Sequence, residues 1–339
     1  MITLMETHTV TLDATDRALV HALQIDGRAP FRLIGEALGV SENTVARRYR
    51  RLRTAGVLRV VGGVDGTRLG GSAWTIRLRC TPDAAVALAD ALAARPDTSY
   101  VHLLSGGTEI SCSVQTSDAD ESEALLLHRL PRTARVTSVS AHLLLGRYAL
   151  PSTWAGAAAL TPEQAARLAP PPVDDTGDIT LLPADRPLLE HLARDGRASH
   201  AELAAATGRP ESTVRRRLAA LRAAGVLVLL IDIPPAALGF RTEARLWMSV
   251  RPSRLTAVAE ELARHPEVSL VALTTGPTNL LAAVNCRDTQ ALSRYLTERV
   301  AALDAIRSME TAPVIRTVKR AGALLPGASG RPGRVLRSG

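Results

Sequence analysis

The sequence predicts an α+β protein in which two winged-helix-like helix-turn-helix domains alternate with two ferredoxin-like βαββαβ sheet domains. The first observation is an internal repeat, because residues 12–58 return without a gap as residues 181–227. The second is a helical period broken by glycine inside each copy, and the third is the apolar–polar alternation that follows, which is typical of strands. A two-part unit is therefore present twice in one polypeptide, as a covalent version of a homodimer.

The domain boundaries follow from these patterns and from changes in composition. Between the copies, Thr161 is expected to cap a short helix, and Pro170, Pro171 and Pro172 predict an extended hinge. The end of the chain is rich in Gly, Pro and Arg and is expected to be disordered and basic. The predicted parts are helix-turn-helix domains at 1–62 and 179–231, sheet domains at 63–150 and 232–322, a linker at 151–178 and a tail at 323–339.

Composition favours a cytoplasmic protein with a polyanionic partner. The net charge is +8, and all but one of the 41 basic residues are arginine, the exception being Lys319. A bias of this kind is also typical of a GC-rich bacterial genome, so the placement of the charge says more than its total. No apolar run is long enough for a bilayer and no signal peptide is recognised. The three cysteines form no CxxC pair and are expected to be reduced.

The first repeat begins with the pattern of three short helices. One is expected over 13–26 and to end at Gly27 in the left-handed conformation, and a second over 31–38 is expected to end at Gly39. Ser41 is then placed to cap a third helix. A helix, a turn with glycine and a capped helix form the spacing of a helix-turn-helix, whose second helix enters the major groove of DNA.

The third helix has one apolar stripe and one polar, basic face in both copies. The stripes are Val45, Tyr49 and Leu52 in the first copy and Val214, Leu218 and Leu221 in the second. Short polar side chains at the start of the outward face can reach base edges, and arginines can hold phosphates. Arg48 and Arg217 lie beside the stripe, where they can either contact phosphate or brace the helix against its neighbours. The predicted DNA-binding residues are Ser41, Glu42, Asn43, Thr44, Arg47, Arg48, Arg50, Arg51, Glu211, Ser212, Thr213, Arg215, Arg216 and Arg217.

After the helices, each copy follows the order βαββαβ. In the stretch 74–80 of the first copy, apolar and polar residues alternate, which predicts a half-buried strand. Helices are expected over 82–94 and 118–130, and the last strand over about 134–148. In the second copy the corresponding helices are expected over 252–264 and 288–303, and the last strand over 306–319.

Both copies resemble the leucine-responsive/AsnC (Lrp/AsnC) family of bacterial and archaeal transcription regulators. In the first copy the resemblance rests on Leu12-Asp13-x-x-Asp16, Asp26-Gly27-Arg28, Gly39-Val40-Ser41, Val45-x-x-Arg48 and Leu52-x-x-x-Gly56-Val57-Leu58. In the second it rests on Asp185, Asp195-Gly196-Arg197, Gly208, Val214-x-x-Arg217 and Leu221-x-x-x-Gly225-Val226-Leu227. It implies a sequence-specific DNA-binding regulator with double-stranded DNA as partner and with sheet domains that assemble into homo-oligomers.

The resemblance also implies a small effector, typically an amino acid, bound between sheet domains near a turn that reads Gly-x-x-Asp. Glu109 keeps the family's charge with a longer arm, whereas Asn279 loses it. A hairpin turn without a ligand, which needs only glycine and a polar residue, accounts for the same residues. The predicted effector-binding residues are Gly106, Gly107, Thr108, Glu109, Gly276, Thr278 and Asn279.

Three other interpretations remain open from the sequence. A plain helical bundle with a solvated arginine face would not bind DNA, and an effector-binding or partner-binding module could lack DNA affinity. Some relatives of the family are decarboxylases acting on a haem precursor, and His102 and His142 could face a tetrapyrrole carboxylate. The second copy has no matching pair, and no nucleophile, metal cluster or phosphate loop is recognised. We therefore predict a regulator that is not an enzyme and has no cofactor or metal ion.

Overall fold

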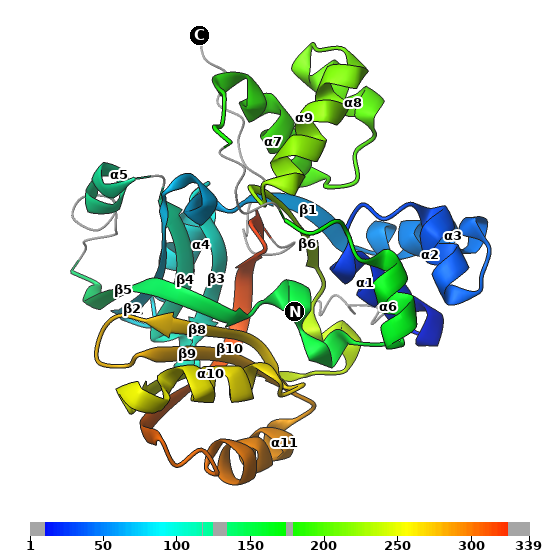
Figure 1. Ribbon diagram of the computed structural model, residues 1–339. Helices are drawn as coiled ribbons and strands as arrows, with labels where there is room; N and C mark the ends of the chain where they lie inside the picture. Colours follow the sequence, from blue (N-terminus) through cyan, green and yellow to red (C-terminus); the bar gives the residue numbers. More distant parts are fainter. Residues whose placement is uncertain (1–10, 117, 125–133, 174–178, 325–339) are drawn as a thin grey trace, which may run out of the picture.

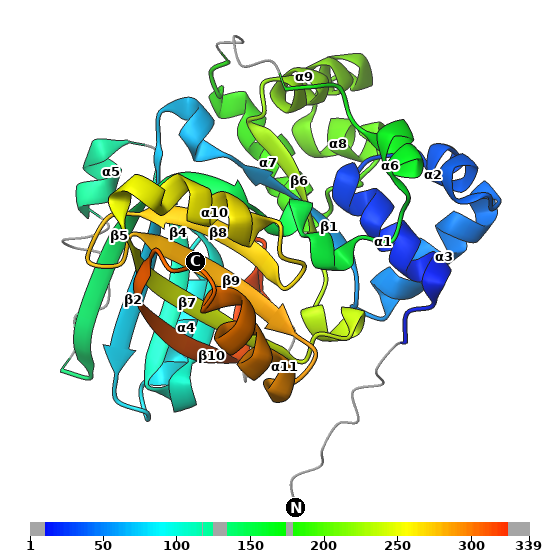
Figure 2. The same cartoon turned by 60° about the horizontal axis from the view of Figure 1, so that its bottom comes forward.

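The computed structural model describes residues 11–116, 118–124, 134–173 and 179–324. Two helical modules lie on one side of a body built from sheets, as Figures 1 and 2 show from two directions. Within the described residues, no helix has both the length and the apolar character needed to cross a bilayer.

The first helical module consists of α1 (Ala14–Ile25), α2 (Phe31–Leu38) and α3 (Glu42–Thr54). Asp13 and Asp16 form a reciprocal capping box at the start of α1, with the Asp16 amide donating to the Asp13 carboxylate at 2.8 Å. Gly39 ends α2 in the left-handed conformation, at a φ of 69°, which glycine adopts without a steric cost. The predicted stripe of Val45, Tyr49 and Leu52 is buried.

The second module repeats this design with α7 (Arg186–Arg194), α8 (His200–Thr207) and α9 (Glu211–Ala223). Its predicted stripe is also buried, in a core that includes Leu192 and Leu203. Between the modules, β1 (Arg59–Val64) and β6 (Leu227–Asp232) pair antiparallel, so the two copies share a two-stranded ribbon. Arg59 and Asp232 lie opposite each other at its end, and their side chains form a salt bridge of 2.5 Å.

Both sheet domains have the predicted order βαββαβ. The first contains β2 (Ser72–Cys80), α4 (Ala85–Ala93), β3 (Thr98–Leu104), β4 (Glu109–Thr116), α5 (Ala119–Glu123) and β5 (Val136–Ala149). The second contains β7 (Thr242–Val250), α10 (Leu255–Ala263), β8 (Val268–Thr274), β9 (Leu280–Cys286), α11 (Thr289–Arg294) and β10 (Ile306–Arg320). The strand orders β3-β4-β2-β5 and β8-β9-β7-β10 are those of ferredoxin-like sheets. Part of the helix expected over 118–130 lies outside the described residues.

The two sheets are joined into one closed structure by their last strands. β5 pairs with β2 of its own copy and with β8 of the other, whereas β10 pairs with β7 of its own copy and with β3 of the other. The nine-stranded sheet therefore runs β11-β10-β3-β4-β2-β5-β8-β9-β7 and returns to β10. Closure removes unpaired sheet edges, which are otherwise prone to aggregate.

Helices cover the outside of this closed sheet, and the inside is shared by both copies. Ala89 and Leu92 of α4 pack on the first sheet, and Val258 and Leu262 of α10 pack on the second. On the inside, an apolar cluster combines the two copies through Leu104, Trp247, Leu281 and Ala312. The polar side of β2 faces solvent only in part, which corrects the expectation of a half-buried strand. Thr75 is 5% exposed and the Arg77 guanidinium lies 4.1 Å from the centre of the Trp247 ring, whereas the Arg79 side chain is 58% exposed.

The linker packs against the first helical module instead of running free between the copies. Its predicted short helix is present as α6 (Pro162–Leu168), capped by Thr161. Trp154 and Leu168 belong to the core of the first module, and the Gln164 side chain donates to the Ala37 carbonyl at 2.9 Å. Residues 174–178 of the predicted hinge lie outside the described residues.

The start of the predicted disordered tail is ordered, which corrects the boundary at residue 323. Ala323 and Leu324 form a short strand, β11, that pairs with the end of β10. The turn between them has positive φ angles at Ala321 (51°) and Gly322 (78°), the pattern of a two-residue hairpin loop. The sequence analysis missed it because alanine rarely adopts this conformation. Residues 325–339 lie outside the described part of the chain.

A buried polar network crosses the inside of the closed sheet. His102 of β3 is 4% exposed; its Nδ1 lies 3.1 Å from Thr317 Oγ1 and its Nε2 lies 2.7 Å from the Arg245 guanidinium. Because arginine can only donate, Nε2 must accept and Nδ1–H must donate to Thr317. Burial, together with the nearby Arg245, holds the pKa of His102 well below its usual range, so the ring is neutral.

We expect this neutral histidine to make the fold sensitive to acid. Between the lowered folded pKa and the unfolded value of about 6.5, the unfolded chain binds more protons, so stability falls as the pH falls through this window. One proton contributes a slope of up to about 1.4 kcal/mol per pH unit. Chemical denaturation at pH 7.5 and at pH 5.5 should show a smaller difference for His102→Gln, whose amide can keep both hydrogen bonds without titrating. Parallel profiles for the two proteins would contradict the assignment.

Candidate nucleic-acid interface

The two candidate recognition helices, α3 and α9, begin differently. The Ser41 side chain caps α3 by accepting from the Thr44 amide at 3.2 Å, and its hydroxyl also bonds to the Thr44 hydroxyl at 2.9 Å. Pro210 stands at the same place before α9 and provides no side-chain cap. Glu42 and Glu211 lie in the first turn of each helix, where negative charge complements the helix dipole.

Four arginines extend from the exposed surfaces of these helices. Arg47 on α3 and Arg216 on α9 stand at equivalent positions of the repeat, and both are exposed. Arg50 and Arg215 are also exposed, but each is present in only one copy. None of the four forms a hydrogen bond or salt bridge to another residue in the part of the chain that the structure describes. Their guanidinium groups are therefore accessible to phosphate oxygens.

Three of the other predicted DNA-binding arginines are engaged within their own module. Arg48 donates to Asp13 at 2.7 Å and to Asp16 at 2.9 Å, and Arg51 also pairs with Asp16. In the second copy, Arg217 donates to Asp185 and to the Thr180 carbonyl. These bonds hold the recognition helix against the first helix of the module.

The electrostatics of these contacts agree with their geometry. The backbone amide of Asp16 and the guanidinium of Arg48 lower the pKa of Asp13, and the same ion pairs raise that of Arg48. Burial disfavours the ionised form of Asp185, but Arg217 and the Leu182 amide outweigh it and lower its pKa.

Asn43 and Ser212, the predicted base-reading residues, lie at equivalent exposed positions near the starts of α3 and α9. Thr44 and Thr213 are half-buried, and the Thr44 hydroxyl is already bonded to Ser41. Asn43 and Ser212 are therefore better placed than the threonines to reach base edges.

The two helical modules are cross-linked by reciprocal contacts that the sequence analysis missed. Arg53, at the end of α3, pairs with Asp195 at 2.7 Å, and Arg222, at the end of α9, pairs with Asp26 at 2.7 Å. Arg28 donates to the Gly196 carbonyl at 2.8 Å, whereas Arg197 donates to the Gly27 carbonyl at 2.7 Å. The Asp-Gly-Arg corner of each copy thus binds the other copy.

The glycines of these corners allow the close approach. The predicted left-handed end of the first helix at Gly27 is wrong, because α1 ends at Ile25 with Asp26 as its extended C-cap and Gly27 has no positive φ. A Cβ atom on Gly27 would lie 2.9 Å from the Val60 side chain, and one on Gly196 would lie 3.0 Å from the same side chain. The signal was present in the sequence, because Asp-Gly-Arg occurs at the same place in both copies, but nothing local showed that it faces the other copy.

The predicted effector turn of the first copy lies between β3 and β4. Gly106 and Gly107 have φ angles of 76° and 82°, and the Thr108 hydroxyl donates to the Ser105 carbonyl at 3.0 Å. Glu109 is 5% exposed and forms an ion pair with Arg77, which also pairs with Glu310 of the second copy. The carboxylate expected to meet a ligand is therefore already neutralised by an arginine.

The equivalent turn of the second copy has another set of contacts. The Asn279 side chain accepts from the Val250 amide at 2.8 Å and donates to the Val250 carbonyl at 2.9 Å, fastening the end of β7 to the turn. The Thr278 carbonyl accepts from the Thr274 hydroxyl at 2.8 Å. Gly276 has a φ of 102°, and a Cβ atom there would lie 2.3 Å from the His142 ring. Both the backbone conformation and the available space therefore favour glycine at this position.

Family models match in the order expected from the repeat. The AsnC-type helix-turn-helix domain matches residues 12–53 and again 184–222, and the Lrp/AsnC ligand binding domain matches residues 243–324. Both helical modules and the second sheet domain therefore have an assignment that is independent of the fold.

Two curated relatives each match about one copy. An HTH-type transcriptional regulator of Pyrococcus abyssi is 37% identical over 139 residues, which cover 41% of this chain and 87% of that protein. The regulatory protein AsnC of Escherichia coli is 29% identical over 142 residues, which cover 40% of this chain and 93% of that protein. A single copy of the repeat thus corresponds to nearly a whole relative.

A solved structure extends the likeness to the whole chain. The siroheme decarboxylase NirDL is 15% identical, and the match covers 91% of this chain and 93% of that chain with a TM-score of 0.60. At this identity the likeness concerns the fold alone, and it includes both copies. The helix-turn-helix matches in each half and the similarity to single-copy regulators show that the chain belongs to the Lrp/AsnC family of transcription regulators, as a tandem duplication in one polypeptide.

Proposed function

We propose that this DNA-binding regulator recognises a specific operator with both of its helical modules, so that a single chain contacts both half-sites. The observation that carries the proposal is the pair Arg47 and Arg216, which are exposed at equivalent positions of α3 and α9 and form no hydrogen bond or salt bridge with any described residue. The ion pairs of Arg48 and Arg217 attach each recognition helix to its own module, and the contacts between the Asp-Gly-Arg corners link the two modules.

The recognition chemistry divides between phosphates and bases. Arg47, Arg50, Arg215 and Arg216 would hold phosphate oxygens, which supplies affinity and orientation without reading the sequence. Asn43 and Ser212 would contact base edges in the major groove. Because the copies carry different residues at several of these positions, the two half-sites would differ, and the operator would be an imperfect palindrome.

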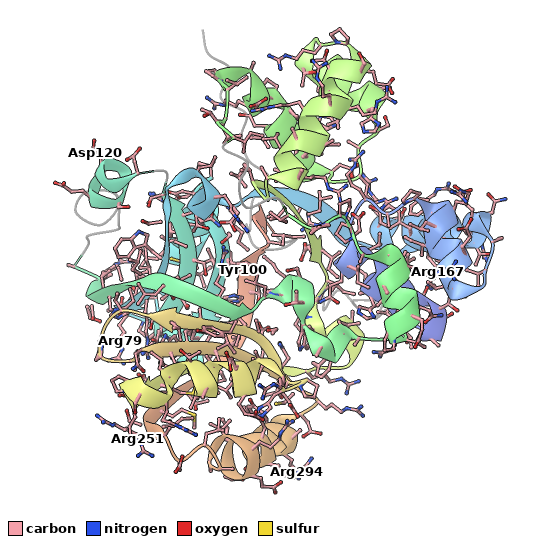
Figure 3. All side chains as sticks on the ribbon, in the orientation of Figure 1. Arg79, Tyr100, Asp120, Arg167, Arg251 and Arg294 are labelled. Carbon is pink, nitrogen blue, oxygen red and sulfur yellow. The ribbon has the colours of Figure 1, made fainter. Side chains whose placement is uncertain are left out.

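We also propose an effector site at the first sheet domain. A cleft of about 210 Å³ there is lined by Arg77, Arg79, Ser138 and Ser140. Arg79, labelled in Figure 3, pairs with Glu310 only at 3.3 Å, and its side chain remains 58% exposed. The exposed Arg79 suits a carboxylate, and an ammonium group that competes with Arg77 for Glu109 or Glu310 would complete the recognition of an amino acid.

The last strands offer surfaces for further assembly of chains. Leu145 on β5 is 60% exposed and Ile315 on β10 is 58% exposed, the two highest fractions among the large apolar side chains of the described residues. We propose that homo-oligomers form through these outer parts of the sheet domains.

The decarboxylase alternative is less well supported by the residues themselves. Both ring nitrogens of His102 are occupied by Thr317 and Arg245 inside the closed sheet, so the ring has no nitrogen available for a tetrapyrrole carboxylate. His142 lies against Gly276 of the other copy, and its own equivalent, Ala312, has no titratable group. A regulator explains the exposed arginines of both copies, whereas an enzyme does not require them.

Arg47→Ala and Arg216→Ala should each weaken operator binding and make its salt dependence shallower by about one unit of the log–log slope, because one phosphate contact is lost. Fluorescence anisotropy with a labelled operator at several salt concentrations measures both. Arg294→Gln is a matched control, since Arg294 is exposed on α11, far from the helical modules (Figure 3). Unchanged binding by both alanine variants, with the fold intact, would falsify the assignment of these helices.

One chain should protect two half-sites whose centres lie about one helical turn, roughly 34 Å, or a multiple of it apart. Footprinting of the variants separates the modules: Arg47→Ala should reduce protection of one half-site first, and Arg216→Ala should reduce protection of the other. If the intact chain protects a single half-site and one module proves dispensable, the proposal that one chain contacts both half-sites is wrong.

Glu109→Gln should weaken binding of an amino-acid effector more than Asn279→Asp does, because only Glu109 supplies negative charge at its turn. Titration calorimetry with a panel of amino acids measures this difference. Asn279→Asp is also expected to lower the stability of the second sheet domain, since a carboxylate cannot donate to the Val250 carbonyl. An effector that binds both variants as tightly as the unchanged protein would place the site elsewhere.

A further inference from the structure

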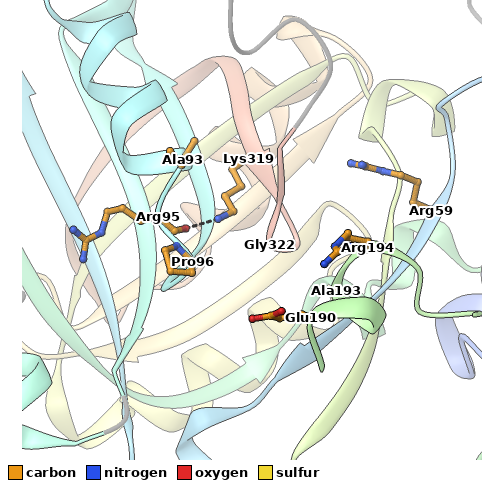
Figure 4. A pocket seen from close by; sticks show the side chains of 10 residues that line it. Arg59, Ala93, Arg95, Pro96, Glu190, Ala193, Arg194, Lys319 and Gly322 are labelled. Atoms are coloured by element: carbon orange, nitrogen blue, oxygen red, sulfur yellow. Dashed lines mark hydrogen bonds between the residues drawn. The ribbon is translucent and has the colours of Figure 1, made fainter. Parts of the chain in front are cut away.

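A second, larger cavity lies where the first sheet domain meets the second helical module. Its volume is about 420 Å³, within the range typical of pockets for small ligands. Figure 4 shows the lining residues, which come from β1, the turn after α4, helix α7, the end of β10 and the turn that follows it. The residues that line this interdomain cavity are Arg59, Ala93, Ala94, Arg95, Pro96, Glu190, Ala193, Arg194, Lys319 and Gly322.

Positive charge dominates the interdomain cavity once internal ion pairs are considered. Arg59 pairs with Asp232, which also binds Arg320. Arg95 pairs with Asp97, and the acidic Glu190 pairs with Arg186. Two cations remain, Arg194 and Lys319. Arg194 is exposed on α7 and forms no hydrogen bond or salt bridge to any other described residue.

Lys319 is the stronger observation. It is the only lysine in a chain with 41 basic residues, and it is only 4% exposed. Its Nζ donates to the Arg95 carbonyl at 2.7 Å, as Figure 4 shows, and to the Thr98 hydroxyl at 3.2 Å. An ammonium group has three N–H donors, so one is left for a further acceptor.

Lys319 also has no counter-ion among the described residues. No carboxylate of the described residues lies within salt-bridge distance of its Nζ, and a buried ammonium without one is costly. Burial accordingly lowers the pKa of Lys319, although Asp97 acts in the opposite direction. An anion in the cavity would supply both the missing charge and the missing acceptor.

We propose that the interdomain cavity binds a small molecule through a phosphate or carboxylate group held by Lys319 and Arg194. The site is distinct from the cleft at Arg77 and Arg79, whose lining residues belong to the paired strands β2 and β5. A ligand here would bridge α7, the first helix of the second helical module, to the turn after α4 and to the β10–β11 turn. It would thereby restrain that module against the sheet body, and any effect on operator binding rests on the proposed function.

Isothermal titration calorimetry of the full chain tests the site directly, with inorganic phosphate and citrate titrated separately at constant ionic strength. We expect saturable binding of at least one of them, and the tighter of the two identifies the anion class. Arg194→Gln should raise the Kd about tenfold or more, the effect expected from loss of one charge-assisted hydrogen bond. Lys319→Met, which keeps the length of the side chain without its charge, should raise it further.

Arg294→Gln is the matched control, because it removes one exposed positive charge that does not line the cavity, and its Kd should stay within about twofold of the unchanged protein. Absence of saturable binding for both anions would overturn the proposal, as would equal weakening by Arg194→Gln and Arg294→Gln. If Lys319→Met fails to fold, the exposed Arg194→Gln still decides the matter. The titration contains no DNA, so its outcome is separate from that of operator binding.

Discussion

The double pairing of the last strand of each sheet domain is the constraint on which the rest of the molecule depends. β5 and β10 each bond to a strand of their own copy and to a strand of the other, and this closes the sheet. Closure orients the two sheet domains, and the β1–β6 ribbon and the Asp-Gly-Arg corners then hold the helical modules beside them. The positions of α3 and α9 follow from backbone hydrogen bonds between copies as much as from contacts within either copy.

Sequence reasoning succeeded where the determining interactions are local. Capping by Ser41, the left-handed Gly39 and the apolar stripe from Val45 to Leu52 lie within a few turns of one another, so periodicity and cap chemistry located α3. The order βαββαβ was likewise readable in both copies. The exposed positions of Arg47 and Arg216 followed from the same helical period.

It failed where a residue's partner lies in the other copy. Arg77 is polar and alternates with apolar neighbours, which suggested a solvent-facing position, yet its guanidinium stacks on Trp247 and pairs with Glu310. Asn279 was considered for its missing charge, although its amide fastens the Val250 backbone. A single sequence carries no local sign of such distant partners, and the same holds for the buried Lys319.

The contact between Arg77 and Trp247 has a consequence for how such a protein can evolve. Because Arg77 and Trp247 occupy equivalent positions of the repeat, a symmetric dimer of identical chains would place two arginines or two tryptophans where this molecule places one of each. Gene fusion therefore permits complementary pairs that identical subunits cannot form. It also fixes the ratio of the two halves at one to one and replaces a second-order encounter with an intramolecular one, so the paired state does not depend on how much protein the cell makes.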